Sequence, residues 1–259
     1  MHPVLDIFGL RLQTFGLAFA GAFLVAGAMI RRRLRERGET ADWAYELVFA
    51  ALLGGLVGAR AYYLLQHYGE VRSDLLGAAF SGSGLVWYGG LIGGVLAVAA
   101  WAWRRRYRAL GLVDLCAPAL AAGYAIGRIG CQLSGDGDYG KASHLPWAMG
   151  YPHGTVPTAP GVRVHPTPVY ETLAMGLVAV WLWNRRDRHS PGVLFALYLV
   201  AAGLERFLVE FVRRNGDVAL GLTAAQLESA AMVLVGGAAL AVARMRRGSA
   251  RPRVAAART

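Results

Sequence analysis

Long blocks of apolar residues alternate along the chain with short polar segments that are rich in arginine. The blocks are about 18 to 22 residues long, the length an α-helix needs to cross a hydrocarbon core of roughly 30 Å at 1.5 Å per residue. The pattern therefore predicts an all-α, polytopic membrane protein with seven transmembrane helices. The predicted spans cover residues 13–30, 44–65, 85–103, 111–127, 168–183, 192–212 and 220–243.

Composition and charge agree with this interpretation. Of the 259 residues, 56% are hydrophobic and only 17% are charged, whereas a soluble domain carries about 25% charged residues. The formal net charge of +11 does not indicate a nucleic-acid partner, because the arginines follow the odd-numbered spans in runs at 31–37, 104–108, 184–188 and 244–253. Since cytoplasmic loops are rich in Lys and Arg, we expect the N-terminus outside and the C-terminus in the cytoplasm.

The chain is expected to form one seven-helix membrane domain, residues 1–243, followed by a basic cytoplasmic tail, residues 244–259. The first span is interpreted as retained, because its basic run follows the apolar stretch and no small-residue cleavage pattern separates the two. Residues 128–167 form a long segment rich in Gly, Pro, His and Tyr, for which we expect an ordered external cap loop. Pairs of glycines four apart, such as Gly54 with Gly58 and Gly90 with Gly94, are typical of close helix packing in lipid.

Charged residues inside predicted spans are the main candidates for chemistry, because each costs at least about 2.5–3.5 kcal/mol near the bilayer centre. They are Arg60, Glu171, Glu205, Arg206 and Glu210, with Arg128 and His165 at the outer boundary. Arg206 and Glu210 are four residues apart, so a structural ion pair is one interpretation of them. Arg60 lies near the outer end of its span and could extend its charged group to the interface.

Four longer stretches of sequence are more specific than any single residue. They are SGSGLVWYGGLIGG (81–94), GYAIGRIGCQLSGDGDYGK (123–141), VHPTPVYETL (164–173) and ERFLVEFVR (205–213). Together, and in this order, they make the chain resemble the prolipoprotein diacylglyceryl transferase family over nearly its whole length. The resemblance implies a bacterial inner-membrane enzyme that moves diacylglyceryl from phosphatidylglycerol to the lipobox cysteine thiol of preprolipoproteins, releasing glycerol 1-phosphate.

The resemblance also implies roles for individual residues. Arg128 and Arg206 match the two key arginines of the family, which would neutralise the departing phosphate, and Glu210 would orient Arg206. Tyr88 stands where the family has a histidine, and is carried over as the fourth candidate catalytic residue. The expected substrate-binding residues are Arg60, Cys131, Ser134, Asp136, His165, Tyr170 and Phe15.

Several of these positions depart from the family pattern. Cys131 and Ser134 replace two asparagines, Asp136 replaces a glutamate, and Phe15 replaces a tyrosine. A phenol with a pKa near 10 is a poor base at neutral pH, so thiolate formation could instead depend on His165, on Arg128 lowering the pKa of the thiol, or on Tyr88 acting as a hydrogen-bond donor.

A second hypothesis is therefore a lipid-binding homologue without this chemistry, and a third is a transporter, although no internal repeat supports it. Phosphatidylglycerol, preprolipoproteins and membrane lipid are the expected partners. Asp136 and Asp138 lack the further oxygen ligands of a cation site, so neither a metal nor a cofactor is expected.

Overall fold

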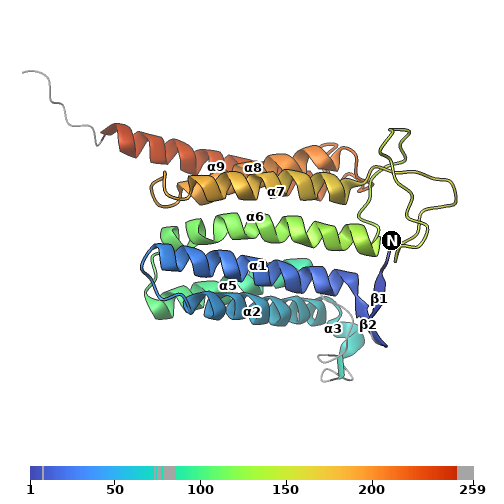
Figure 1. Ribbon diagram of the computed structural model, residues 1–259, viewed down its shortest axis with the longest axis horizontal. Coiled ribbons are helices and arrows are strands. Elements are labelled where there is room, and N and C mark those ends of the chain that lie inside the picture. The colour runs from blue at the N-terminus through green and yellow to red at the C-terminus, as the bar shows by residue number, and fades with distance from the viewer. Residues whose placement is uncertain (8, 73, 75–76, 79–85, 250–259) are drawn as a thin grey trace, which may run out of the picture. The chain divides into compact units, whose positions relative to one another are not determined.

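The computed structural model describes residues 1–7, 9–72, 74, 77–78 and 86–249 (Figure 1). The first five residues of the 81–94 stretch and the end of the basic tail lie outside these ranges. The chain forms two compact units. The first unit comprises Met1–Ala26 and Val113–Thr259, and the second comprises Gly27–Leu112.

Within the described residues, seven long helices match the seven apolar blocks, with boundaries that differ by a few residues in most cases. They are α1 (Thr14–Glu36), α2 (Trp43–Gln66), α5 (Trp87–Arg105), α6 (Ala109–Ser134), α7 (Thr167–Arg185), α8 (Val193–Glu210) and α9 (Ala224–Ser249). The short helix α3 (Tyr68–Val71) follows α2. The largest error is at the end of α6, which continues seven residues beyond the predicted span. Arg128 is therefore inside a helix and not at the start of the loop.

The described part of the chain has four helices that are long and apolar enough to cross a membrane: α1, α2, α6 and α9. Their best windows have a mean hydropathy of 1.6 to 1.7 and at most 44% of each window is buried inside the protein, as expected for helices that face lipid. The helix α8 is also apolar, but its 18 residues include three charged ones, Glu205, Arg206 and Glu210. The chain is thus a multi-pass membrane protein made mostly of helices.

A β-hairpin precedes the first helix, which the all-α prediction missed. Strand β1 (Val4–Ile7) pairs with β2 (Leu10–Gln13) in antiparallel register. The turn contains Gly9 at φ 82°, a conformation that glycine adopts without strain, and Asp6 accepts a hydrogen bond from the Gly9 amide at 3.1 Å. The alternating apolar and polar residues around this glycine were the signal for a hairpin.

In the second unit, α2 and α5 cross at a stripe of glycines. A Cβ atom placed on Gly58 would lie 2.3 Å from the Gly89 carbonyl oxygen, and one on Gly54 would lie 2.5 Å from the Gly93 carbonyl oxygen. Only hydrogen side chains fit between backbones that approach so closely. The predicted pair Gly54 and Gly58 is therefore at the contact, and on α5 the tightest positions are Gly89 and Gly93.

In the first unit, small residues of α6 pack against α7 and α8. The buried core contains Ala117, Ala121, Ala125, Met175, Ala179, Leu182, Leu194 and Ala202. The carboxylate of Asp114 on α6 accepts hydrogen bonds from the amides of Gly192 and Phe195, at 2.7 and 2.8 Å, at the start of α8. Such capping satisfies amides that have no partner within the helix, and it fixes the register of α8 against α6.

The segment between α6 and α7 is an ordered loop whose two ends are joined by backbone hydrogen bonds. We call these joined ends the paired base of the loop. The Gly140 amide donates to the His165 carbonyl at 2.8 Å, and the His165 amide donates back to the Lys141 carbonyl at 3.0 Å. Lys141 also donates through its amide to the Val212 carbonyl at 2.7 Å. Both ends of the loop are thereby joined to each other and to the chain that follows α8. In Figure 1 this loop lies at the same end of the first unit as the N-terminus.

Candidate active site

Arg128, on the last third of α6, is held by acidic groups from two other segments. Its Nε lies 2.5 Å from Glu171 Oε2, and Nη1 forms an ion pair with Asp138. Nη2 donates to the Tyr124 hydroxyl at 3.2 Å, and the guanidinium lies 5.0 Å from the centroid of the same ring. The helical spacing of Tyr124 and Arg128 places both on one face of α6. The arginine is therefore rigidly positioned, with 16% of its side chain exposed.

Glu171, on the first turns of α7, is fully buried and accepts from three donors. Besides the Arg128 contact, Oε2 accepts from the Tyr124 hydroxyl at 2.5 Å, and Oε1 accepts from Arg213 Nη1 at 2.9 Å. A buried carboxylate is stable only when it is paired and hydrogen-bonded in this way. Glu171 therefore bridges two arginines that are far apart in the sequence.

Arg213, in the turn after α8, contacts a second carboxylate that faces Arg128. Its Nη2 lies 2.6 Å from Asp138 Oδ1. Burial by itself would raise the pKa of Asp138, but Arg128 and Arg213 outweigh burial and hold this pKa below its ordinary value. Asp138 is therefore a charged bridge between the two guanidinium groups. Its backbone carbonyl accepts a 2.5 Å hydrogen bond from the Thr167 hydroxyl, which fixes the loop at this point.

Glu210, at the end of α8, holds the remaining arginine. Its Oε2 lies 2.7 Å from Arg206 Nη1, so the ion pair expected from their four-residue spacing is present. Oε1 accepts from Asn215 Nδ2 at 2.6 Å and from the Thr223 hydroxyl at 2.9 Å. Arg213 Nε approaches Oε2 at 3.7 Å, which joins this group to the Glu171 group.

We call these six residues the charged cluster: Arg128, Arg206, Arg213, Asp138, Glu171 and Glu210. Three cations and three carboxylates make it neutral, so the cost of burial is offset by mutual pairing. Glu205, part-buried on α8, interacts electrostatically with several members, yet among the described residues it has neither a hydrogen bond nor an ion pair. It therefore adds a fourth carboxylate that is not required for charge balance.

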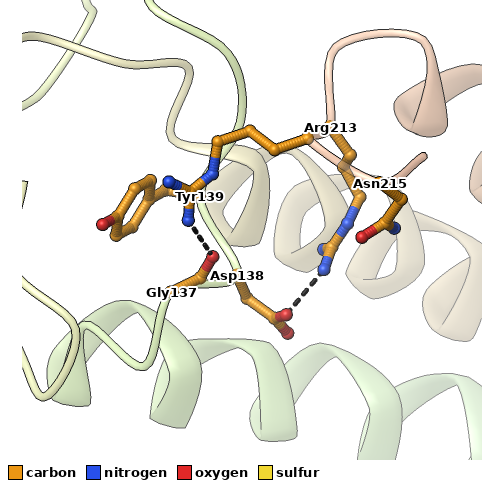
Figure 2. Close-up of a pocket in the computed structure, with 6 residues that line it drawn as sticks. Gly137, Asp138, Tyr139, Arg213 and Asn215 are labelled. Atoms are coloured by element: carbon orange, nitrogen blue, oxygen red, sulfur yellow. Dashed lines mark hydrogen bonds and ion pairs between the residues drawn. The ribbon is translucent and has the colours of Figure 1, made fainter.

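A polar cavity of about 350 Å³ opens beside the cluster (Figure 2). It is lined by Gly137, Asp138, Tyr139, Arg213, Arg214 and Asn215. Arg214 donates to the Gly137 carbonyl at 2.9 Å and its guanidinium stacks 4.2 Å from the Tyr139 ring centroid. Two arginines in a small polar cavity suit an anionic group, because planar guanidinium groups bind phosphate oxygens in pairs.

The decisive comparison is with a family model described as prolipoprotein diacylglyceryl transferase, which matches residues 3–242. The chain belongs to this family. A relative from Clostridium tetani, named phosphatidylglycerol–prolipoprotein diacylglyceryl transferase, is 31% identical over 241 residues, covering 91% of this chain and 95% of the relative. Proteins of the same name from Geobacter sulfurreducens and Leptospira interrogans are 34% and 32% identical, covering 88% and 80% of this chain and 89% and 73% of their own lengths.

Three of the expected substrate-binding residues of this transferase family member surround the end of α6. The Cys131 thiol is buried and lies 3.9 Å from Arg128 Nη1, and the buried Ser134 hydroxyl donates to the Cys131 carbonyl at 3.3 Å. Asp136 accepts from the Asp138 amide at 3.2 Å, and burial raises the pKa of Asp136. One ligand atom each from Cys131, Asp136 and Asp138 lies within 4.8 Å of the others, but Asp138 is already neutralised by two arginines.

His165 and Tyr170 are neighbours at the start of α7. His165 Nδ1 lies 3.4 Å from the Tyr170 hydroxyl, which accepts a 2.8 Å hydrogen bond from Trp147 Nε1. The His165 backbone pairs with the loop base described above. These contacts place His165 at the junction of the cap loop and α7, with its ring directed to Tyr170.

Arg60 and Tyr88 belong to the second unit. Arg60 is buried, with 9% exposed, and its guanidinium lies 5.1 Å from the Tyr63 ring centroid, so it packs against this ring. Tyr88 lies on the first turn of α5, 45% exposed, with its ring 5.2 Å from that of Trp87. Phe15, in the first unit, is 44% exposed on the first turn of α1.

Sequence reasoning missed three members of the charged cluster. Asp138 was considered only as a possible cation ligand, Glu171 was noted as an intramembrane charge without an assigned role, and Arg213 was only the last residue of a stretch. The available signal was that Glu171 and Arg213 both lie in stretches that carry the family resemblance. Their pairing spans 42 residues of sequence, which no local spacing rule could reveal.

Proposed function

We propose that this chain is a phosphatidylglycerol–prolipoprotein diacylglyceryl transferase of the bacterial inner membrane. In the reaction, the cysteine sulfur of a preprolipoprotein forms a thioether with the terminal glycerol carbon of the diacylglyceryl group. The bond between that carbon and the phosphate oxygen breaks, glycerol 1-phosphate leaves, and the thiol proton is released. Family membership and the names of the relatives support this activity.

The observation that carries the proposal is the arginine-rich charged cluster beside a polar cavity. As the carbon–oxygen bond breaks, negative charge builds on the phosphate, and fixed cations stabilise it without reorganisation. We assign this role to Arg128 and Arg206, whose side chains are 16% and 21% exposed and thus accessible to a headgroup. Glu210 acts as a positioning residue, because it holds Arg206 at 2.7 Å.

The thiol attacks the reacting carbon from the side opposite to the phosphate, and its proton is removed on that side. Tyr88, His165 and an Arg128-assisted fall in the pKa of the thiol are the three routes that the sequence supports. The headgroup phosphate is expected to replace carboxylate contacts of the arginines when lipid binds. Cys131, Ser134 and Asp136 are then substrate-binding residues at the end of α6, with Tyr170, Phe15 and Arg60 as further candidates.

The proposed topology has seven spans, the N-terminus outside and the C-terminus in the cytoplasm. Arginines near the C-terminal ends of α1, α5 and α7 support it, since each of these helices has basic residues in its last turn. With this orientation, the cap loop and the hairpin are external. Membrane lipid surrounds the helices, and no nucleic-acid partner is expected.

The test is transfer of labelled diacylglyceryl to a reporter lipoprotein in a bacterium depleted of its own transferase. Arg128→Ala and Arg206→Ala should each lower transfer by about 10²-fold or more, since loss of one donor to a developing anion costs about 2.7–4 kcal/mol. Arg104→Ala, which removes an exposed arginine at the end of α5, is the matched control and should keep full transfer. Full activity in both site variants would refute the phosphate assignment.

A second function is favoured by the departures at Tyr88, Cys131, Ser134 and Phe15. A homologue that binds phospholipid without transferring it would keep the arginines and lose the groups that assist proton transfer. Stable binding of labelled phosphatidylglycerol by the purified protein, with no labelled lipoprotein formed, would support this function over the first.

A further inference from the structure

The hairpin before α1 has one face made of leucines. Leu5 on β1 is paired directly with Leu12 on β2, and Leu10 lies two residues before Leu12, so all three are on the same side of the sheet. They are 37%, 66% and 36% exposed. We call these three residues the leucine face.

The opposite face is mostly polar. Asp6 is paired with Arg11, and Val4 with Gln13, all of them exposed. The hairpin is therefore amphipathic: one face is apolar, and the other carries the oppositely charged pair Asp6 and Arg11. Each residue of the leucine face is at least 36% exposed in the described part of the chain.

Isolated two-stranded hairpins are at best marginally stable in water, so an apolar face of this kind needs a contact. The chain itself indicates which contact. β2 ends at Gln13 and α1 begins at Thr14, so the hairpin continues directly into a helix that is apolar enough to span a membrane and only 11% buried in its best window. The Thr14 amide and hydroxyl both donate to the Pro3 carbonyl, at 3.0 and 3.1 Å, which fixes the base of the hairpin to the helix end.

The first turns of α1 also expose apolar side chains. Phe15 and Phe19 are 44% and 47% exposed, and their rings lie 6.4 Å apart along one side of the helix. Because phenylalanine rings are wholly apolar, exposed Phe15 and Phe19 at the start of a spanning helix are expected to contact lipid. The hairpin is thus attached at the level where α1 enters the bilayer.

We propose that the leucine face lies in the boundary between headgroups and acyl chains of the leaflet where α1 begins, with the polar face toward water. The partner is the lipid surface itself. This contact also fixes the height of the cap loop, because the His2 amide donates to the Leu133 carbonyl at 3.0 Å and Met1 packs against the Tyr139 and Tyr151 cluster. The proposal is independent of the transferase activity.

Collision accessibility of spin labels tests it directly. The background is the full chain carrying Cys116→Ala and Cys131→Ser. Leu10→Cys and Leu12→Cys, with Arg11→Cys and Gln13→Cys as controls, would be made one at a time and spin-labelled in nanodiscs of phosphatidylglycerol and phosphatidylcholine. Labels at 10 and 12 should be more accessible to oxygen than to a water-soluble nickel complex, at a depth of about 5–10 Å below the phosphates. Labels at 11 and 13 should show the reverse.

Water-like accessibility at all four positions would overturn the proposal. Low accessibility to both reagents with spin–spin broadening would also overturn it, since this would indicate a second copy of the chain on the leucine face. The unmodified chain provides an independent readout in nanodiscs with a photoactivatable phosphatidylcholine. Lipid adducts on the hairpin peptide are expected, and adducts on α1 alone would contradict the proposed contact.

Discussion

Neutralising Glu171 should destabilise the protein far more than neutralising Glu205, although both are glutamates associated with the same cluster. Glu171 is fully buried and accepts from Arg128, Arg213 and Tyr124, at 2.5, 2.9 and 2.5 Å. Glu171→Gln keeps the shape of the side chain but leaves the cluster with one excess positive charge. Removing one partner of a buried ion pair costs about 3–5 kcal/mol.

The expected change in unfolding temperature follows from this free energy. For a chain of this size, 1 kcal/mol corresponds to about 2–4 °C, so Glu171→Gln should lower the apparent midpoint by roughly 6–20 °C. Glu205→Gln removes a carboxylate that has no ion pair and lies near the negative Glu171. Its midpoint should stay the same or rise, because the change removes a part-buried negative charge that has no ion-pair partner among the described residues.

The assay is heating of the purified protein in mild detergent, followed by size-exclusion measurement of the folded fraction under one fixed heating protocol. A double-mutant cycle makes the result specific to the pair: Arg213→Gln should cost less in the Glu171→Gln background than in the unaltered chain. Equal shifts for the two glutamate variants, or strict additivity in the cycle, would refute the reasoning.

Two further predictions concern the helix crossing and the cap loop. Gly58→Ala should lower stability by about 1–3 kcal/mol, because the new methyl group meets backbone at 2.3 Å, whereas Gly55→Ala, with its nearest atom at 3.5 Å, should change thermal unfolding little. Because the pKa of Asp138 is below its ordinary value in the folded protein, its contribution to stability is present above the unfolded pKa of about 3.9 and is lost as the pH falls below it. The measurement is the unfolding midpoint from pH 7 to pH 3. Asp138→Asn should have a lower midpoint than the unaltered chain at neutral pH and a smaller fall on acidification, while the control Asp217→Asn should follow the unaltered chain. Identical pH profiles for the two variants and the unaltered chain would contradict this.

The helices could be predicted because apolar blocks of membrane length, ended by arginines, depend on local composition. The end of α6 could not be predicted, because residues 128–134 include polar residues and a glycine, a pattern typical of a loop that follows a helix. There, contacts of Arg128 with Glu171 and Asp138 allow the helix to continue around a charged side chain. The hairpin was missed because its strands have only four residues each, which is shorter than the windows that identify spans.

For the site, local spacing was sufficient only where partners share a helix. Arg206 and Glu210 were paired correctly from their four-residue separation. The contact between Arg213 and Asp138 spans 75 residues, so it depends on how α6, α8 and the loop pack. The family resemblance selected Arg128, Arg206 and Glu210, and the structure adds Arg213, Asp138 and Glu171 to the same cluster.

The paired base of the cap loop affects which residues of the loop can vary. Because Gly140, Lys141 and His165 close the loop through backbone hydrogen bonds, side chains between them can change without altering the ladder. Exposed residues of the loop tip can therefore vary while the hydrogen-bonded ends of the loop near Asp138 stay the same. Tyr151 is an exception, because it is fully buried, stacks on Tyr139 and donates to Gln132, so it joins the tip to the end of α6.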